Sequence, residues 1–276
     1  MKKETFKKFI VCICLLLCMM PNMLMAQNKK PVNMQNYDNE LYHYGFILGY
    51  NQMLFSINYI NDYQNVIHNA DELPSSDVLI GTNDVFLTSP FKVYDINTHI
   101  THGFTVGIVG NLRLAQYLDL RFIPSLSFGE RKISYTIVSL QEDLMDGSIK
   151  EVEKTISSDT HSTFVEFPIH IKYKSKRNYN TAAYILAGAN YKIDMASQKK
   201  FYDSSNGKPK TLSVNRHDLA AEIGAGFDFY TGYFKLGIEL KMSYGLLNVA
   251  KNENFMYANS FESLRNKTFQ LSFTFE

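Results

Sequence analysis

Two histidine-containing motifs have the residue types that could support chemistry. His99 and His102 are three residues apart, a spacing that would place two metal ligands on one face of a helix. Here they lead into an expected strand, where residues three apart point to opposite faces, so we expect no metal pair. His161-Ser162, with Asp159 nearby, offers the residue types of a hydrolase. The G-x-S-x-G nucleophile turn is missing from the sequence, so we expect no catalytic triad.

Three glutamates, Glu166, Glu222 and Glu239, could converge and perform acid–base chemistry. Lysine and arginine residues occupy the same polar faces, however, and a buried charge without a partner is costly. Opposite charges are therefore expected together, as a structural network rather than a catalytic site. The predicted network consists of Arg121, Glu166, Lys172, Glu222, Glu239 and Lys241. We predict no enzyme activity, no cofactor and no metal site.

These residues lie on short runs in which apolar and polar residues alternate. A period of two is typical of β-strands whose two faces meet different surroundings. The chain also has 18 Tyr and 20 Phe, and aromatic enrichment favours strands. Gly224 and Gly226 begin no helix and are expected to relieve crowding inside the sheet. We predict eight strands of about ten residues, over 45–51, 104–114, 118–128, 165–173, 181–194, 218–229, 234–244 and 268–275.

The lengths of the connections favour a membrane barrel over a soluble sandwich or lipocalin-like barrel, which would alternate as well. The predicted connections after the first, third, fifth and seventh strands are long: Tyr59–Asn97, Val138–His161, Ala196–Arg216 and Leu247–Lys267. The others are short: Ala115–Tyr117, Lys174–Asn180 and Thr231–Gly232. Outer-membrane barrels sort their connections in this way, with tight periplasmic turns and long outer loops.

We therefore predict an all-β fold, a closed antiparallel eight-stranded transmembrane β-barrel of the outer-membrane type with long extracellular loops. Closure is expected because every strand-edge N–H and C=O group must be paired in lipid. The uncharged faces would then contact lipid and the charged faces would fill the interior. The sequence ends on a strand with the near-terminal aromatic Phe275, followed by Glu276, as is common in such barrels.

The first residues have the features of an export signal. Lysines precede an apolar run from Phe9 to Met20 that is shorter than the roughly 20 residues a membrane helix needs. We expect a cleaved signal peptide over 1–26, with cleavage between Ala26 and Gln27, rather than a membrane anchor. All three cysteines lie within this segment. The expected domains of the mature chain are a short periplasmic segment over 27–42 and the barrel over 43–276.

The net charge of +1 gives no electrostatic argument for nucleic-acid binding, so we expect no nucleic-acid partner. Outer-membrane lipid is the expected partner of the uncharged faces. A basic run at an expected periplasmic turn, Lys174, Lys176 and Arg177, could contact a partner, although a solvated turn is the alternative interpretation.

The chain resembles the PorT family of outer-membrane barrels, which is associated with the type IX secretion system of Gram-negative bacteria. The matching stretches are His43–Asn51, Asn111–Leu114, Leu120–Pro124, Leu126–Gly129, Val165–Pro168, Ile171–Arg177, Gly188–Tyr191, Gly224–Tyr230, Tyr233–Lys235, Glu239–Lys241 and Leu271–Phe273. The resemblance covers nearly all of the expected mature chain, in order, and is weakest in the outer loops. It implies no catalytic residues.

The resemblance implies a non-enzymatic accessory or assembly role in type IX export, hence in the export of surface proteins or in gliding, with other secretion components as partners. A general surface barrel, acting as an adhesin, receptor or small pore, is the alternative. An outer-membrane enzyme is a third possibility. The interior of an eight-stranded barrel is only wide enough for side chains, so any secretion role must act through binding rather than passage.

Overall fold

The computed structural model describes residues 31–69, 90–142, 149–196, 214–251 and 260–276, and these form an all-β structure. The expected signal peptide over 1–26 and its cleavage site at Ala26 and Gln27 lie outside them. Among the described residues no helix reaches the length and apolar character needed to cross a membrane. Two short 3-10 helices are present, η2 (Tyr37–Asn39) and η3 (Tyr63–Asn65).

Within the described ranges, eleven strands form one antiparallel sheet. They are β1 (Tyr42–Tyr59), β2 (Ile67–His68), β3 (Phe91–His99), β4 (Thr101–Ala115), β5 (Leu118–Phe122), β6 (Ser125–Glu142), β7 (Ile149–Lys174), β8 (Thr181–Asp194), β9 (His217–Tyr230), β10 (Lys235–Gly245) and β11 (Phe261–Phe275).

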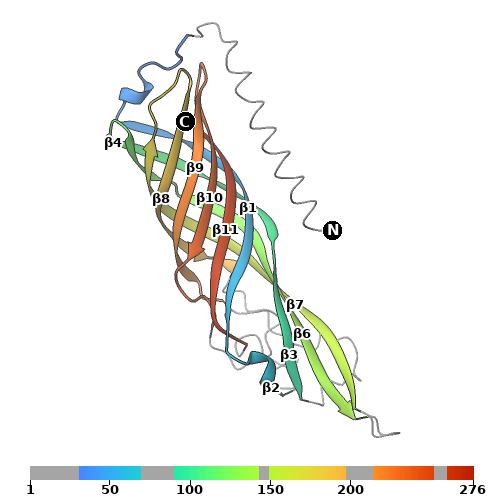
Figure 1. The fold of residues 1–276 in the computed structure, drawn as a ribbon. Helices are drawn as coiled ribbons and strands as arrows, with labels where there is room; N and C mark the ends of the chain where they lie inside the picture. Colours follow the sequence, from blue (N-terminus) through green and yellow to red (C-terminus); the bar gives the residue numbers. More distant parts are fainter. Residues whose placement is uncertain (1–30, 70–89, 143–148, 197–213, 252–259) are drawn as a thin grey trace.

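The backbone pairings form a complete ring, which is seen from the side in Figure 1. The first strand pairs with the last, because Phe46 lies opposite Phe275, and it also pairs with β4, because Phe46 lies opposite Ile108. Between these ends the ring runs through β11, β10, β9, β8 and β7 to β5 and β6. β5 and β6 share one place in the ring, since both pair with β4 on one side and β7 on the other. The break between them contains Pro124, which has no N–H to donate to a ladder.

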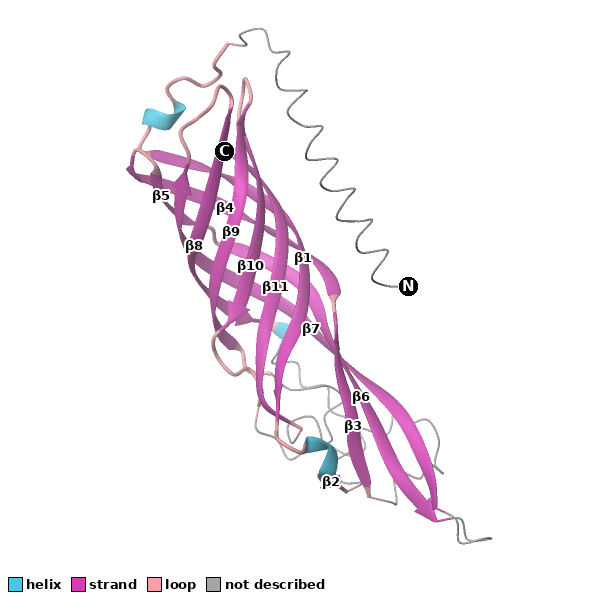
Figure 2. Ribbon diagram, in the orientation of Figure 1, coloured by secondary structure: helices cyan, strands magenta, loops and turns pink. Residues whose placement is uncertain are grey.

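Strands occupy all eight predicted segments, and β8 has the predicted bounds, Thr181–Asp194. The single strand predicted over 118–128 is wrong, because the break at 123–124 divides it into β5 and β6. The three predicted short connections are present as well, between β4 and β5, between β7 and β8, and between β9 and β10. These connections lie together at one end of the ring, which we call the short-turn end, as Figure 2 shows. The opposite end, toward β2 and the tip of β6 and β7, is called the loop end.

The prediction of a long loop over Val138–His161 is wrong. β6 and β7 continue as a hairpin well past the ring, with Val138 opposite Glu153 and Lys132 opposite Asp159. β3 pairs with β6 within the same region, so three strands form an extension beyond the loop end (Figures 1 and 2). Glu151 and Glu153 on the exposed face gave this segment the composition of a loop, although they alternate with Val152.

Two further long connections are shorter than predicted for the same reason. β2 and β3 lie within the expected loop Tyr59–Asn97, and β11 begins at Phe261, within Leu247–Lys267. β11 pairs with β1 up to Tyr59, so both strands extend beyond their predicted ranges, 45–51 and 268–275.

The interior at the loop end is apolar, which the sequence did not predict. A hydrophobic cluster fills it, formed by Phe55, Phe91, Val93, Ile96, Ile133, Tyr135, Ile137, Ile156, Val214, Val249, Phe261 and Leu264. The inward face of the strands therefore changes from polar near the short-turn end to apolar near the loop end.

Candidate functional site: the charged interior

The outward faces of the ring strands form an uncharged belt. The outward residues of β10 are Leu236, Ile238, Leu240, Met242 and Tyr244, and Leu240 is 63% exposed. The outward residues of β9 between Leu219 and Phe229 are equally free of charge. Such runs of about ten residues match the length of a tilted strand that crosses a bilayer.

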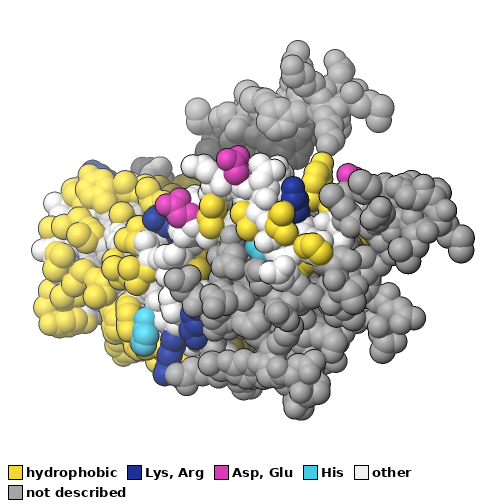
Figure 3. Space-filling model, turned by 90° about the horizontal axis from the view of Figure 1, so that it is seen from below, with side chains coloured by type: hydrophobic (Ala, Val, Ile, Leu, Met, Phe, Trp, Pro, Cys, Tyr) yellow, Lys and Arg dark blue, Asp and Glu magenta, His cyan; other side chains and the backbone are white. Residues whose placement is uncertain are grey.

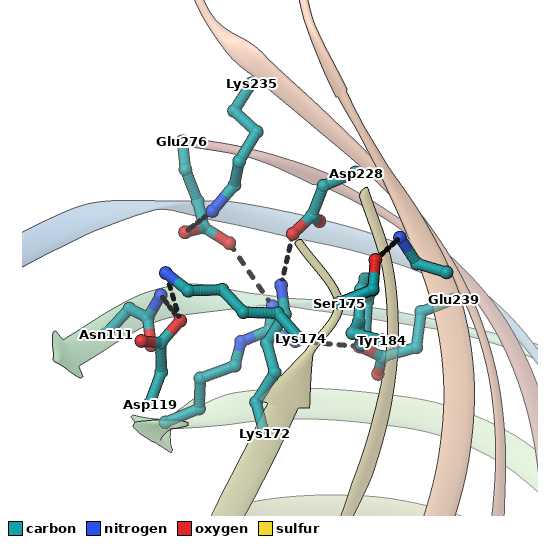
Figure 4. Close-up of polar contacts among 12 residues, drawn as sticks. Asn111, Asp119, Lys172, Lys174, Ser175, Tyr184, Asp228, Lys235, Glu239 and Glu276 are labelled. Carbon is teal, nitrogen blue, oxygen red and sulfur yellow. Dashed lines mark hydrogen bonds and ion pairs between the residues drawn. The ribbon is translucent and has the colours of Figure 1, made fainter. Parts of the chain in front are cut away.

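Arg121 lies at the centre of the interior near the short-turn end. Its Nη1 is 2.7 Å from Glu239 Oε2, and its Nη2 is 3.4 Å from Glu276 Oε1, while its side chain is 0% exposed. Glu276 also pairs with Lys235, whose Nζ is 2.7 Å from Oε2. Figure 4 shows Lys235 and Glu276 pointing toward one another. The last residue thus contributes a carboxylate to the interior.

Lys172 on β7 pairs with Asp228 on β9 at 2.7 Å, and its Nζ lies 3.6 Å from the centre of the Tyr184 ring (Figure 4). The Tyr184 hydroxyl donates a hydrogen bond of 3.0 Å to Glu239. Room for the Tyr184 ring exists because position 226 is glycine, where a Cβ would come within 2.6 Å of the ring. The predicted role of Gly226 in relieving crowding agrees with this packing.

The remaining two glutamates lie in a second part of the interior. Glu222 Oε2 is 2.9 Å from Lys241 Nζ and 2.6 Å from His170 Nε2. Asn190 joins the glutamates, because its Nδ2 donates to Glu222 at 2.8 Å and to Glu166 at 3.1 Å. Lys192 approaches Glu166 at 3.4 Å.

Arg131 marks the change from the polar to the apolar part of the interior. It pairs with Asp194 at 2.7 Å and donates hydrogen bonds to Ser162 and Asn266. Its guanidinium also lies over two rings, 4.7 Å from the centre of Phe55 and 4.9 Å from that of Phe164. A guanidinium suits this position because it accepts aromatic contact on its face and donates hydrogen bonds from its edge.

The six residues predicted for the network are therefore all buried, and each pairs with an oppositely charged or hydrogen-bonding group. Sequence reasoning did not identify their main partners His170, Asp228, Glu276 and Lys192, nor the separate Arg131–Asp194 pair. Alternation along each strand could have identified these partners. Asp228 and Glu222 are an even number of positions apart on β9, so their side chains point to the same, inward face. Each of the three glutamates forms hydrogen bonds or ion pairs. Asn190 joins Glu166 to Glu222, whereas Glu239 contacts Arg121 and Tyr184 instead.

The two histidine motifs do not assemble into sites. His99 contacts Ser134 and His102 contacts Tyr50, and all four side chains are exposed. The expected opposite orientation of the two histidines is wrong, because the break between β3 and β4 at Ile100 interrupts the alternation. Within the described parts of the chain, no three His, Cys, Asp or Glu side chains gather as metal ligands.

The hydrolase residue types are also dispersed. His161 pairs with Glu130 at 2.8 Å, and Asp159 pairs with Lys132 at 3.3 Å, both on the exposed side. Ser162 is buried on the other face, where it accepts a hydrogen bond from Arg131. These three side chains share no common contact.

The residues before β1 cover the short-turn end. The Asn33 backbone N–H donates to Asn180 Oδ1 at 2.8 Å, and Asn33 Nδ2 donates to the Tyr230 carbonyl at 3.1 Å. The Tyr230 hydroxyl donates to Asp38 at 3.0 Å, and the Tyr37 ring lies 4.8 Å from Lys235 Nζ. Burial, the largest influence, raises the pKa of Tyr37, so this phenol stays neutral at physiological pH. We call residues 31–41 the N-terminal cap.

The cap occupies much of the basic turn that was predicted to contact a partner. Arg177 donates to the carbonyl oxygens of Asn33 and Met34 and lies 3.6 Å from Asp38. Lys174 pairs with Asp119 at 3.3 Å and approaches Asp38 at 3.7 Å. Of the three predicted contact residues only Lys176 is exposed, and its side chain makes no hydrogen bond or ion pair with the described residues.

Comparison with solved structures finds a similarity to Ail, the attachment invasion locus protein of Yersinia pestis, solved in complex with the heparin analogue sucrose octasulfate. The identity is 13%, the TM-score is 0.35, and the alignment covers 86% of this chain and 98% of Ail. A likeness of this size establishes neither a shared fold nor a shared ligand. No curated protein sequence matches the chain.

The sequence profile of the outer membrane protein beta-barrel domain matches residues 25–251, which is most of the chain. This assignment agrees with the ring of antiparallel strands, the uncharged belt and the charged interior. It also gives the location of the protein, the bacterial outer membrane. The chain belongs to the outer membrane protein beta-barrel domain family.

Proposed function

We propose that this protein is an eight-stranded, closed transmembrane β-barrel without enzymatic activity that serves the type IX secretion system as an accessory or assembly component. Its short-turn end faces the periplasm and its loop end faces the cell exterior, as in other outer-membrane barrels. The observation that carries the non-transport part of this proposal is the filled interior. The secretion part is supported by the resemblance to the PorT family.

Side chains occupy the interior along its length. Near the periplasmic end the ion pairs of Arg121, Lys172 and Lys235 cross it, and near the outer end the apolar cluster around Phe55 and Tyr135 fills it. Breaking a buried pair by removing one partner costs roughly 3–5 kcal/mol, so clearing a path would require disrupting several such contacts. Cargo therefore passes elsewhere, and this barrel contributes by contact with other components.

Two surfaces are available for that contact. The three-stranded extension of β3, β6 and β7 projects beyond the uncharged belt into the exterior. On the periplasmic side the N-terminal cap and the exposed Lys176 form the accessible surface. A secretion partner in the periplasm would meet the cap before it met the basic turn beneath it.

Secretion profiling of a clean gene deletion tests this proposal. We expect type IX cargo to be lost from the cell surface and medium, and to return when the intact gene is supplied in trans. Complementation with Glu166→Ala, Glu222→Ala or Glu239→Ala variants should restore export in proportion to the amount of folded barrel, since these residues serve the structure. Normal cargo export in the deletion strain would exclude the secretion role.

A general surface barrel, acting as an adhesin or receptor, is the second candidate, and the exterior extension favours it. It predicts that shortening the β6–β7 hairpin, by joining Lys132 to Asp159 through a short turn, abolishes ligand binding while secretion continues. The small-pore version of this candidate is disfavoured by the filled interior. The two candidates are separated by applying the same hairpin variant to secretion profiling and to cell-surface binding assays.

A further inference from the structure

A pocket of about 510 Å³ lies on the extension, at the junction of η3, β2, β3, β6 and β7. Its volume is in the range of small-ligand sites in proteins. Apolar lining comes from Ile67 of β2, Pro90 and Phe91 at the start of β3, and Val138 of β6. The pocket thus has an apolar floor in a part of the molecule that lies beyond the lipid-facing belt. Figure 3 views the loop end, where charged side chains lie among uncharged ones beside a hydrophobic flank.

The strand register places Lys92 between the apolar residues Ile67 and Val138, and the acidic residues beyond Val138. Ile67 lies opposite Lys92, Lys92 opposite Val138, and Val138 opposite Glu153. Glu151 is two residues from Glu153 along β7 and therefore on the same face. The base on β3 and the acids on β7 are separated by two strand spacings, roughly 10 Å, with Val138 between them.

The two carboxylates are available to a ligand. Glu151 and Glu153 are exposed and make no recorded ion pair with other described residues. This contrasts with the interior, where each of the three predicted network glutamates has a partner. Ile67 and Tyr94, which also line the pocket, are 63% and 62% exposed, so the pocket presents apolar surface as well as charge.

We propose that this pocket binds the basic side chain of a polypeptide at the cell surface, a lysine or arginine whose aliphatic stem packs on Val138 and whose cationic end meets Glu151 and Glu153. The two carboxylates of Glu151 and Glu153 outnumber the one ammonium of Lys92, so the pocket favours a cation over an anion. The apolar floor selects a cation carried on a hydrocarbon stem over a small inorganic ion. The inference is independent of whether the barrel serves secretion.

A local spectroscopic readout tests this assignment without knowledge of the natural partner. The intact protein, labelled at Ile and Val methyl groups and reconstituted in lipid nanodiscs, would be titrated with the peptide acetyl-Leu-Lys-Leu-amide. The Ile67 and Val138 methyl resonances report on the pocket. We expect saturable shifts at these two residues, and at least tenfold weaker binding of the matched peptide in which norleucine replaces lysine.

The double variant Glu151→Gln/Glu153→Gln should weaken binding of the lysine peptide at least tenfold and leave the rest of the methyl spectrum unchanged. Glu262→Gln removes an exposed carboxylate of β11 outside the pocket and should leave affinity unchanged. Equal affinity for the two peptides, no effect of the double variant, or the absence of a saturable shift at Ile67 and Val138 would each overturn the proposal. Loss of secretion in the deletion strain has no bearing on this result.

Discussion

Burial separates the charged pairs of this protein into two energetic classes. The Arg121–Glu239 pair has both side chains 0% exposed, whereas the Lys132–Asp159 pair has side chains 39% and 46% exposed. Removing one partner of a buried pair leaves a charge without compensation, while exposed pairs are screened by water and contribute about 0–1 kcal/mol. Interior and surface charges should therefore respond very differently to substitution.

The conservative variant Glu239→Gln should destabilise the folded barrel by about 3–5 kcal/mol, because it removes the closest carboxylate from Arg121. Urea-induced unfolding in lipid vesicles measures this change. The matched control Asp159→Asn should alter the unfolding free energy by less than about 1 kcal/mol. Similar effects of the two variants would mean that water reaches the interior pair freely.

Glycine at position 226 determines where Tyr184 can lie. A Cβ there would be 2.4 Å from the Ile238 carbonyl oxygen and 2.6 Å from the Tyr184 ring. Gly226→Val should therefore cost about 1–3 kcal/mol through overpacking and weaken the Tyr184–Glu239 hydrogen bond. Heat resistance of the folded band on gels measures the loss. Gly232→Ala, at a turn with no atom within 4 Å of the added Cβ, is the control and should be tolerated.

At the scale of single residues, the alternation along each strand predicted which charged side chains lie inside, but not which of them form ion pairs. Lys172 and Asp228 are 56 positions apart, and Arg121 and Glu239 are 118 apart. Their contact depends on how the ring closes and how its strands are staggered, and neither follows from alternation within a strand. Long side chains add freedom, because a lysine can reach partners on several strands.

At the scale of elements, the lipid-facing strands were predictable because lipid on one side and charge on the other enforce a strict alternation. β8 has the predicted bounds, although its small residues gave the weakest pattern. The β6–β7 hairpin was missed because its exposed face meets water and carries Glu151 and Glu153. A strand with a wet, charged face has the composition of a loop, so composition alone does not reveal it.

The N-terminal cap is an element that neither strand periodicity nor charge indicated. Asp38 is its main ionic contact with the body, through Tyr230, Arg177 and Lys174. Because these groups are partly exposed, Asp38→Asn should weaken cap docking by only about 0.5–1 kcal/mol. Faster amide hydrogen exchange over residues 31–41 would report this change.

Glu40→Gln is the matched control for the cap, since Glu40 is exposed and forms no recorded ion pair with described residues. It should leave the exchange rates unchanged. If Asp38→Asn also leaves them unchanged, the backbone contacts of Asn33 and the ring contacts of Tyr37 hold the cap without help from charge.

At the scale of the whole molecule, the uncharged belt determines how the protein sits in the membrane. Leu240 lies in the middle of the outward face of β10. Leu240→Arg should destabilise the inserted barrel by about 2–4 kcal/mol, the cost of arginine near the bilayer midplane. Ser157→Arg, on the exposed face of the extension, should have little effect. Folding titrations into vesicles compare the two, and equal costs would place the belt elsewhere.

The filled interior also predicts the electrical behaviour of the barrel. Ion pairs near the short-turn end and the apolar cluster near the loop end should together prevent ion flow. Purified protein in planar lipid bilayers should show no stable conductance steps. Regular steps from the monomeric barrel would show that the interior contacts open, and would restore the small-pore interpretation.

The N-terminal cap has a consequence for the order in which the molecule is completed. Its contacts join Asn33 to Asn180 and Tyr37 to Glu276, residues 147 and 239 positions apart. Asn180 lies just before β8, Tyr230 ends β9, and Glu276 follows β11. The cap can therefore make all of these contacts only after β11 has paired with β1. Protection of residues 31–41 from protease would thus report that the ring of strands is complete, and not that its assembly has begun.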